Sequence, residues 1–172
     1  SGDTTGETSR GVVGYAAIGM YERPLGDRPA LSREAGMALV RAARQTLERA
    51  LIHGEPQPQA TPDVTQYPEL SQASGIFVTL RRKGLLCGCI GRIQTDEPLA
   101  KTVPIVALDS ALRDRRFAPV RGEDLEQIHI EVSVLSDPQP IPDARQIVAG
   151  RDGVVLRSQD QGGVFLPTVW DE

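Results

Sequence analysis

The sequence predicts an α+β fold, in which helices flank a mostly antiparallel sheet. A long amphipathic helix pattern covers residues 32–53, and a hairpin pattern follows at residues 76–90. A strand pattern covers residues 128–136, and a closing strand pair is expected at residues 153–158 and 162–167. Helices and strands do not alternate strictly, and hairpins pair their strands antiparallel. These observations together predict the α+β class.

The composition is that of a globular chain of 172 residues, about one domain in length. Hydrophobic residues make up 40% of the chain but aromatic residues only 4%, so aliphatic side chains must fill the core. The net charge of −4 and the pI of about 5.3 argue against nucleic-acid binding, which usually requires a basic face. No apolar run approaches the roughly 18–20 residues that span a bilayer. With two cysteines and no signal peptide, we expect a cytoplasmic protein with reduced thiols.

The first part of the chain has an unusual order of segments. Residues 1–10 are polar, residues 11–20 have the pattern of a short apolar strand, and residues 22–31 resemble a linker with two prolines. A strand that ends in such a linker is typical of the end of an upstream unit rather than the start of a domain.

Residues 32–53 form the clearest predicted helix. Ser32 is a good N-cap and Gly54 is a typical helix stop. Apolar side chains recur at three- and four-residue spacing, and charged side chains, Arg44 among them, are expected on the other face. Residues 54–74 contain several prolines and no periodicity, so we expect a long loop there.

A hairpin and a second helix are expected next. Residues 76–90 combine two β-rich runs with a turn-like sequence at residues 82–84. Pro98 lies close to the beginning of a helical pattern. Pro104 suits a first turn better than a helix interior, so we expect regular helix from about Thr102 or Val103 to Arg113.

Both cysteines of the chain lie in the sequence "LLCGCIG", residues 85–91. On a regular strand Cys87 and Cys89 would share a face, with Cα atoms roughly 6.5 Å apart. That separation is close to the upper limit for a disulfide, and strand geometry aims the Cβ atoms poorly for one. Gly88 and Gly91 could allow a bulge or the close approach of a ligand.

Three interpretations of these thiols remain open. Both could be small buried hydrophobes, since free cysteine is among the most buried residue types. Cys89 could be a reactive thiolate, which requires partial exposure and a nearby cation. A structural zinc site would need four ligands, and the chain adds only His53 and His129 to the pair, with no recognisable spacing. No metal site is therefore predicted.

The strand pattern at residues 128–136 gives a polar face carrying His129, Glu131 and Ser133. Such alternation is typical of a half-exposed strand, so solvation alone explains it. The functional alternative is that this face meets the cysteine segment, with His129 as a base for Cys89 and Glu131 orienting that base.

Several segments resemble the AMMECR domain family, also called AmmeMemoRadiSam system protein A. They occur in the expected order: "GIFVTL", "LLCGCIG", "DRRFAPV", "IHIEVSVLSDPQPI" and "GGVFLPTV". The hallmark of the family has the form Leu-Arg-Gly-Cys-Ile-Gly. In this chain it comprises Leu86, Cys87, Gly88, Cys89, Ile90 and Gly91.

The departures from the family pattern concern the candidate site. Cys87 replaces the hallmark arginine, so activation of the Cys89 thiol would need another arginine. His129 is not part of the pattern, whereas Glu131 is. The family's Asp-Pro-Arg-Phe run is kept except for its proline, and here it comprises Asp114, Arg115, Arg116 and Phe117.

The resemblance also implies a division of the chain. Residues 1–21 resemble the end of a Memo-like domain, residues 22–31 form a linker, and residues 32–172 form the AMMECR-type domain without the family's further C-terminal helix. Family members resemble α+β proteins with a larger and a smaller subdomain, and their hallmark motif lies near a cleft.

The resemblance leaves the function open among three hypotheses. The domain could be an enzyme component acting with Memo-like and radical SAM partners, through Cys89 and the polar groups Asp114, Arg116 and Glu131. It could instead be a non-catalytic interaction module that docks to the same partners. Nucleic-acid binding is the hypothesis that the acidic composition argues against. Neither a cofactor nor a substrate follows from the sequence.

Overall fold

The computed structural model describes residues 31–166, with gaps at 56, 59–60, 137, 139–140, 142, 151 and 158–161. The expected strand at residues 11–20, the Memo-like remnant at 1–21 and nearly all of the linker at 22–31 lie outside the described residues. Within the described part of the chain, no helix is long and apolar enough to cross a membrane.

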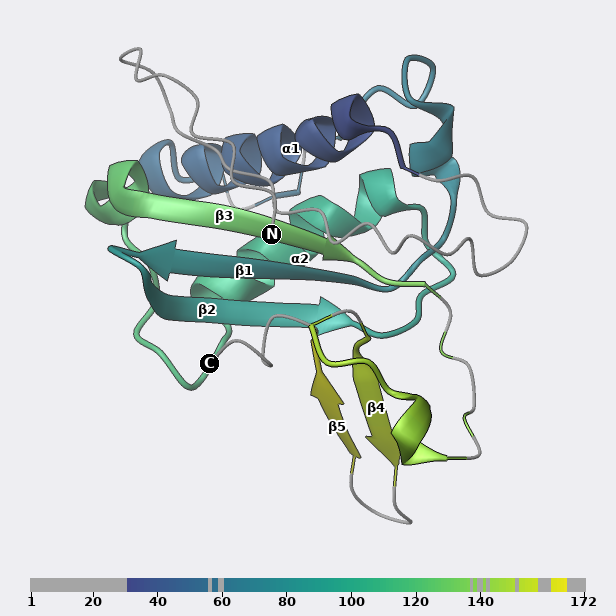
Figure 1. Cartoon of the computed structure of the whole chain (residues 1–172). Helices are drawn as coiled ribbons and strands as arrows, with labels where there is room; N and C mark the ends of the chain where they lie inside the picture. The colour runs from purple at the N-terminus through teal and green to yellow at the C-terminus, as the bar shows by residue number, and fades with distance from the viewer. Residues whose placement is uncertain are drawn as a thin grey trace.

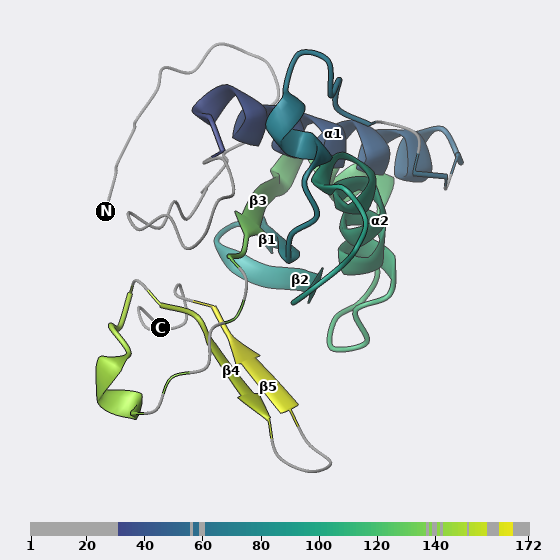
Figure 2. The ribbon, with the colours of Figure 1, turned by 90° about the vertical axis from the view of Figure 1, so that its right-hand side faces the viewer.

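Two helices cover one face of a three-stranded antiparallel sheet, which confirms the predicted α+β class (Figure 1). The strand order is β2-β1-β3, so the hairpin partner β1 lies in the centre. Both helices lie on the same side of the sheet when the molecule is turned (Figure 2). The elements are α1 (Arg33–Ile52), β1 (Ile76–Arg82), β2 (Leu85–Arg92), α2 (Leu99–Leu112) and β3 (Ile128–Val134).

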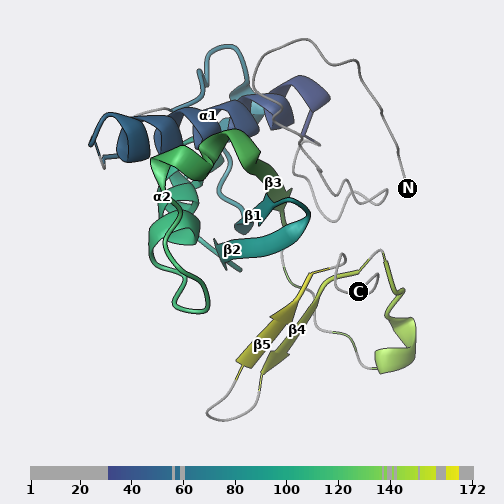
Figure 3. The same ribbon diagram turned by 90° about the vertical axis from the view of Figure 1, so that its left-hand side faces the viewer.

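The expected closing strand pair is also present, as a separate two-stranded antiparallel sheet of β4 (Val154–Arg157) and β5 (Gly162–Phe165). This hairpin lies outside the helix-covered layer (Figure 3). Three short 3-10 helices connect the elements: η1 (Pro68–Ser71), η2 (Gly122–Gln127) and η3 (Ala144–Gln146).

The core lies between the two helices and the sheet. Alternate residues of the central strand face the helices, because side chains of a strand alternate between its two faces. Aliphatic side chains fill the core, as the low aromatic content predicts. The fully buried ones include Leu39, Leu47, Ile76, Val78, Leu80, Val103, Ile130 and Val132.

Helix α1 has the predicted limits. The Ser32 hydroxyl accepts a hydrogen bond from the Ala35 N–H at 3.2 Å, and Gly54 follows the helix with φ +70°. Arg44 differs from the prediction, since it is only 7% exposed. Its guanidinium donates to the carbonyl oxygens of Leu125 (2.7 Å) and Ile128, so buried backbone acceptors compensate for the burial of its charge.

Helix α2 begins earlier than predicted, at Leu99, and therefore contains Pro104 in its interior. Proline lacks an N–H, so the hydrogen bond from residue 104 to the preceding turn is missing. The Thr102 hydroxyl donates to the Pro98 carbonyl oxygen at 3.0 Å, which also accepts from the Lys101 and Thr102 N–H groups.

The tight turn between β1 and β2 confirms the predicted hairpin. Lys83 and Gly84 have φ values of +53° and +82°. Two consecutive positive φ angles define a type I′ turn, whose twist matches that of the flanking strands.

Candidate functional site

A β-bulge separates the environments of the two cysteines. Thr79 pairs with Cys89 and Leu80 with Gly88, but Arg81 pairs with Leu86, which leaves Cys87 as the extra residue. The expectation that both thiols share a face is therefore wrong, because it assumed a regular strand.

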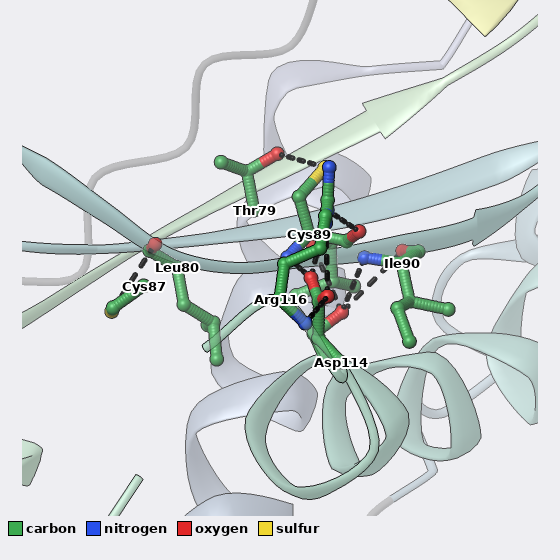
Figure 4. A network of polar contacts seen from close by, with 9 residues as sticks. Thr79, Leu80, Cys87, Cys89, Ile90, Asp114 and Arg116 are labelled. Carbon is green, nitrogen blue, oxygen red and sulfur yellow. Dashed lines mark hydrogen bonds and ion pairs between the residues drawn. The ribbon is translucent and has the colours of Figure 1, made fainter. Parts of the chain in front are cut away.

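The Cys87 thiol packs against the core and donates to the Leu80 carbonyl oxygen at 3.3 Å. Burial raises the pKa of this thiol. Cys89 is half-buried, and its sulfur lies 3.3 Å from the Thr79 hydroxyl oxygen. Figure 4 shows the two side chains pointing apart. Cys87 thus corresponds to the structural interpretation of the motif, and Cys89 is the thiol with polar neighbours.

The sheet face opposite the helices, here called the polar face, carries Thr79 and Arg81 of β1, Cys89 of β2, and His129 and Glu131 of β3. Thr79 lies in register between Cys89 and Glu131. Strands are about 4.8 Å apart, so Cys89 and Glu131 are separated by roughly 10 Å of sheet. The polar face therefore brings the two residues into one row without direct contact.

His129 lies in the neighbouring row, opposite Arg81. Its Nε2 atom is 3.7 Å from Glu131 Oε1, and Arg81 Nε is 3.5 Å from the same oxygen. Strand β1 thus separates His129 from Cys89. A base must be within hydrogen-bond reach of the proton that it accepts, and the structure places His129 beside Glu131 instead.

Both glycines of the motif are required by packing. A Cβ atom on Gly88 would lie 2.2 Å from the Ser110 carbonyl oxygen, so this glycine lets the backbone of α2 approach β2. A Cβ atom on Gly91 would lie 2.2 Å from the Phe77 ring, which covers that position from the opposite strand. The glycines thus position the strand that carries Cys89.

Asp114 and Arg116 bind both backbone groups of Cys89 (Figure 4). The Cys89 N–H donates to Asp114 Oδ2 at 2.8 Å, and Arg116 Nη2 donates to the Cys89 carbonyl oxygen at 2.7 Å. The two side chains also bind each other, since Arg116 Nε donates to Asp114 Oδ1 at 2.9 Å and Nη2 donates to Oδ2 at 2.8 Å. Cys89, Asp114 and Arg116 therefore form a closed ring of hydrogen bonds, here called the Cys89 ring.

Asp114 and Arg116 each stabilise the charged form of the other within the Cys89 ring. The hydrogen bond from Arg116 lowers the pKa of Asp114 to about 2, against the opposing effect of burial. The pKa of Arg116 is raised, mainly by its hydrogen bond with Asp114 and also by its interaction with the Cys89 thiol. The Arg116 side chain is 60% exposed, and its guanidinium lies 5.3 Å from the centre of the Phe117 ring. The ring thus holds the Arg116 guanidinium, paired with the Asp114 carboxylate, against the backbone of the residue that carries the thiol.

Two residues that the sequence analysis did not select also shape the site. Thr79 contacts the Cys89 sulfur, and the cross-strand register is the signal that could have identified it. The Ser110 hydroxyl donates to the Val78 carbonyl oxygen at 2.8 Å and accepts from the Ile90 N–H at 3.0 Å. Ser110 thereby fixes α2 to both strands of the hairpin.

Two shallow concavities lie along α1, away from the Cys89 ring. One is lined by residues from Gln45 to Glu55, and the other lies between α1 and residues 61–67. Among the residues that the structure describes, no group of three or more His, Cys, Asp or Glu side chains is arranged to hold a metal ion.

Comparison with known proteins assigns the family. A family model described as AMMECR1 matches residues 40–172. The chain belongs to the AMMECR1 family. The match includes the whole hairpin, α2 and the Cys89 ring, so the features described above lie within the AMMECR1 domain.

Similar proteins occur in archaea. A protein of Thermococcus gammatolerans is 40% identical over 157 residues, which cover 81% of this chain and 74% of that protein. A protein of Methanosarcina acetivorans is 34% identical over 149 residues, with 83% and 74% covered. The crystal structure of the uncharacterised protein PH0010 from Pyrococcus horikoshii is 36% identical and superposes with a TM-score of 0.70, covering 81% of this chain and 72% of that one. This AMMECR1 domain therefore has the α+β fold of a solved relative.

Proposed function

We propose that this AMMECR1 domain is an enzyme component whose reactive group is the Cys89 thiol and which acts on a small molecule or a peptide. The observation that carries the proposal is the contact set of Cys89. Cys89 is half-buried, its sulfur lies 3.3 Å from the Thr79 hydroxyl oxygen, and its carbonyl oxygen accepts a 2.7 Å hydrogen bond from the Arg116 guanidinium.

The chemistry of thiols supports this assignment. The thiolate, rather than the thiol, is the nucleophile and the redox-active form, and a neighbouring arginine favours it. Arg116 supplies this cation from a different element, so the arginine missing at Cys87 is not needed for the role. Asp114 and Glu131 are the remaining polar groups of the proposal. Asp114 belongs to the Cys89 ring, and Glu131 lies on the polar face, on β3, two strands away from Cys89.

The proposed partners are a Memo-like domain and a radical SAM protein. Their support is the family resemblance of the motif segments, together with the resemblance of residues 1–21 to the end of a Memo-like domain. In this proposal the AMMECR1 domain provides the thiol, and the partners provide the chemistry of their own domains.

Competitive labelling tests the reactive thiol. The folded chain is treated at pH 7 with a limiting amount of iodoacetamide, and peptide mass spectrometry then compares labelling at the two cysteines. We expect Cys89 to be labelled several times faster than Cys87, whose pKa is raised by burial. The variants C87S and C89S assign each signal. Equal or slower labelling of Cys89 would contradict the proposal.

An interaction module remains the second candidate, because packing alone accounts for both glycines of the motif. In that case the domain would bind its partners without using the thiol. The matched comparison uses wild-type chain and C89S as bait for the radical SAM protein. If C89S captures the radical SAM protein as well as the wild-type chain does, and the reaction of the reconstituted system also persists in C89S, the module is the better description.

A further inference from the structure

We infer that Asp114 is a positioning residue for the Cys89 thiol, because its single carboxylate holds the Arg116 guanidinium and the Cys89 backbone in one fixed arrangement. This inference rests on the proposed function of Cys89 and assigns a role to a residue that does not itself touch the sulfur.

The geometry assigns four hydrogen bonds to this carboxylate. Oδ2 accepts from the Cys89 N–H and from Arg116 Nη2, both at 2.8 Å. Oδ1 accepts from Arg116 Nε at 2.9 Å and from the Arg116 backbone N–H at 3.2 Å. A carboxylate with its oxygens fully engaged in this way has little capacity left to act as a base. Its contacts are those of an anchor.

Arg116 needs such an anchor. Its side chain is 60% exposed, whereas Asp114 is only 9% exposed. A long exposed side chain samples many rotamers in solution, and bidentate pairing with a carboxylate restricts it to one. The other contacts of the guanidinium are the Cys89 carbonyl oxygen and the Phe117 ring. Without Asp114 these contacts would have to hold the guanidinium beside the thiol by themselves.

The charges around Cys89 predict opposite changes in its alkylation rate for the two effects that Asp114 could have. Asp114 and Arg116 reach the residue from the segment after α2, Thr79 is the uncharged neighbour on β1, and Glu131 lies one strand further away beside Arg81. By charge alone, an aspartate close to a thiol disfavours the thiolate, so removing its charge should speed alkylation. As an anchor for Arg116, the same aspartate favours the thiolate, so removing its charge should slow alkylation.

The substitution D114N separates the two effects. Every variant is made in the C87S chain, so that only Cys89 reacts, and iodoacetamide rate constants are measured at pH 7. We expect D114N to slow alkylation about tenfold, because the thiolate is less favoured once Arg116 is no longer held in place. The matched control is D109N, because Asp109 of α2 forms a similar 2.7 Å ion pair with Arg113, the residue that follows the helix, without contacting Cys89. D109N should stay within about twofold of the parent.

A double substitution tests whether Asp114 acts through Arg116. In the R116A chain, D114N should cause no further slowing, which a merely structural role would not predict. If D114N does not fold, the substitution R116Q at the exposed Arg116 tests the same contact. An unchanged alkylation rate in R116Q would overturn the inference, because Asp114 is inferred to act on the thiol through Arg116. A D114N chain that folds and reacts as fast as the C87S parent, or faster, overturns the inference.

Different outcomes contradict the proposed function of Cys89 and the role of Asp114. If Cys89 in the C87S chain reacts no faster than Cys87 in the C89S chain, the proposed function fails. If Cys89 reacts faster than Cys87 but D114N leaves its rate unchanged, only the role of Asp114 fails.

Discussion

Replacing Gly88 with alanine tests how closely α2 approaches the cysteine strand. The new methyl group would lie 2.2 Å from the Ser110 carbonyl oxygen, whereas ordinary contact begins at 3.4 Å. Helix α2 would have to retreat by the difference, about 1.2 Å, because the clashing atom belongs to the backbone and cannot rotate away.

The cost has two parts. Overpacking of this kind typically costs about 1–3 kcal/mol. The retreat would also lengthen the hydrogen bonds of the Ser110 hydroxyl with Val78 and Ile90, now 2.8 and 3.0 Å, beyond useful range. Each such bond contributes about 0.5–1.5 kcal/mol, so we expect G88A to lower the free energy of unfolding by roughly 3–5 kcal/mol.

Urea denaturation followed by circular dichroism measures this change. The control is G54A, since Gly54 also has a special conformation (φ +70°) but has no atom within 4 Å of the added methyl group. Conformational strain alone should cost G54A about 1 kcal/mol. If G88A were no more destabilising than G54A, the close approach of α2 to β2 would be refuted.

Three further predictions concern single contacts. S32A should lower the free energy of unfolding by about 1 kcal/mol in urea denaturation, because α1 loses the cap on the Ala35 N–H; an unchanged midpoint would exclude the cap. Because the pKa of Asp114 is about 2 when folded and 3.8 ordinarily, its stabilisation is complete above about pH 4 and is lost as the pH falls through 2. The loss is on the order of 2 kcal/mol, and D114N should flatten the acid limb of the stability profile; an equally steep limb in D114N would assign the loss to other carboxyls. S110A should cost about 1–3 kcal/mol, because the buried Val78 carbonyl oxygen loses its hydroxyl donor; a neutral S110A would show that this bond contributes nothing net.

Local sequence patterns predicted the elements well. The N-cap at Ser32, the stop at Gly54 and the turn at residues 82–84 each depend on the chemistry of one or two neighbouring residues, and the structure confirms them. The start of α2 was predicted three or four residues late, because Pro104 was expected in the first turn and the helix instead accommodates it in its interior.

Features that depend on tertiary contacts were not predictable in the same way. The glycines of "LLCGCIG" made a bulge possible, but nothing in the motif indicated that Cys87 would be the inserted residue and would turn toward the core. Arginine is usually exposed, so the sequence placed Arg44 on the surface; the carbonyl oxygens of Leu125 and Ile128, which accept from its guanidinium, explain its burial. The family resemblance selected Asp114 and Arg116 as candidates, but their hydrogen bonds to Cys89 follow from the packing of α2 against the hairpin.

The rate at which iodoacetamide alkylates Cys89 in folded C87S chain, compared with the same chain in concentrated urea at pH 7, tests the central claim most directly. Iodoacetamide reacts with the thiolate, and a neighbouring arginine favours that form, so Cys89 in the folded chain should react about tenfold faster than in the denatured chain. We predict that folding accelerates the reaction by about this factor. A folded chain that reacts as slowly as the denatured one, or more slowly, would contradict the claim that the Cys89 ring activates the thiol.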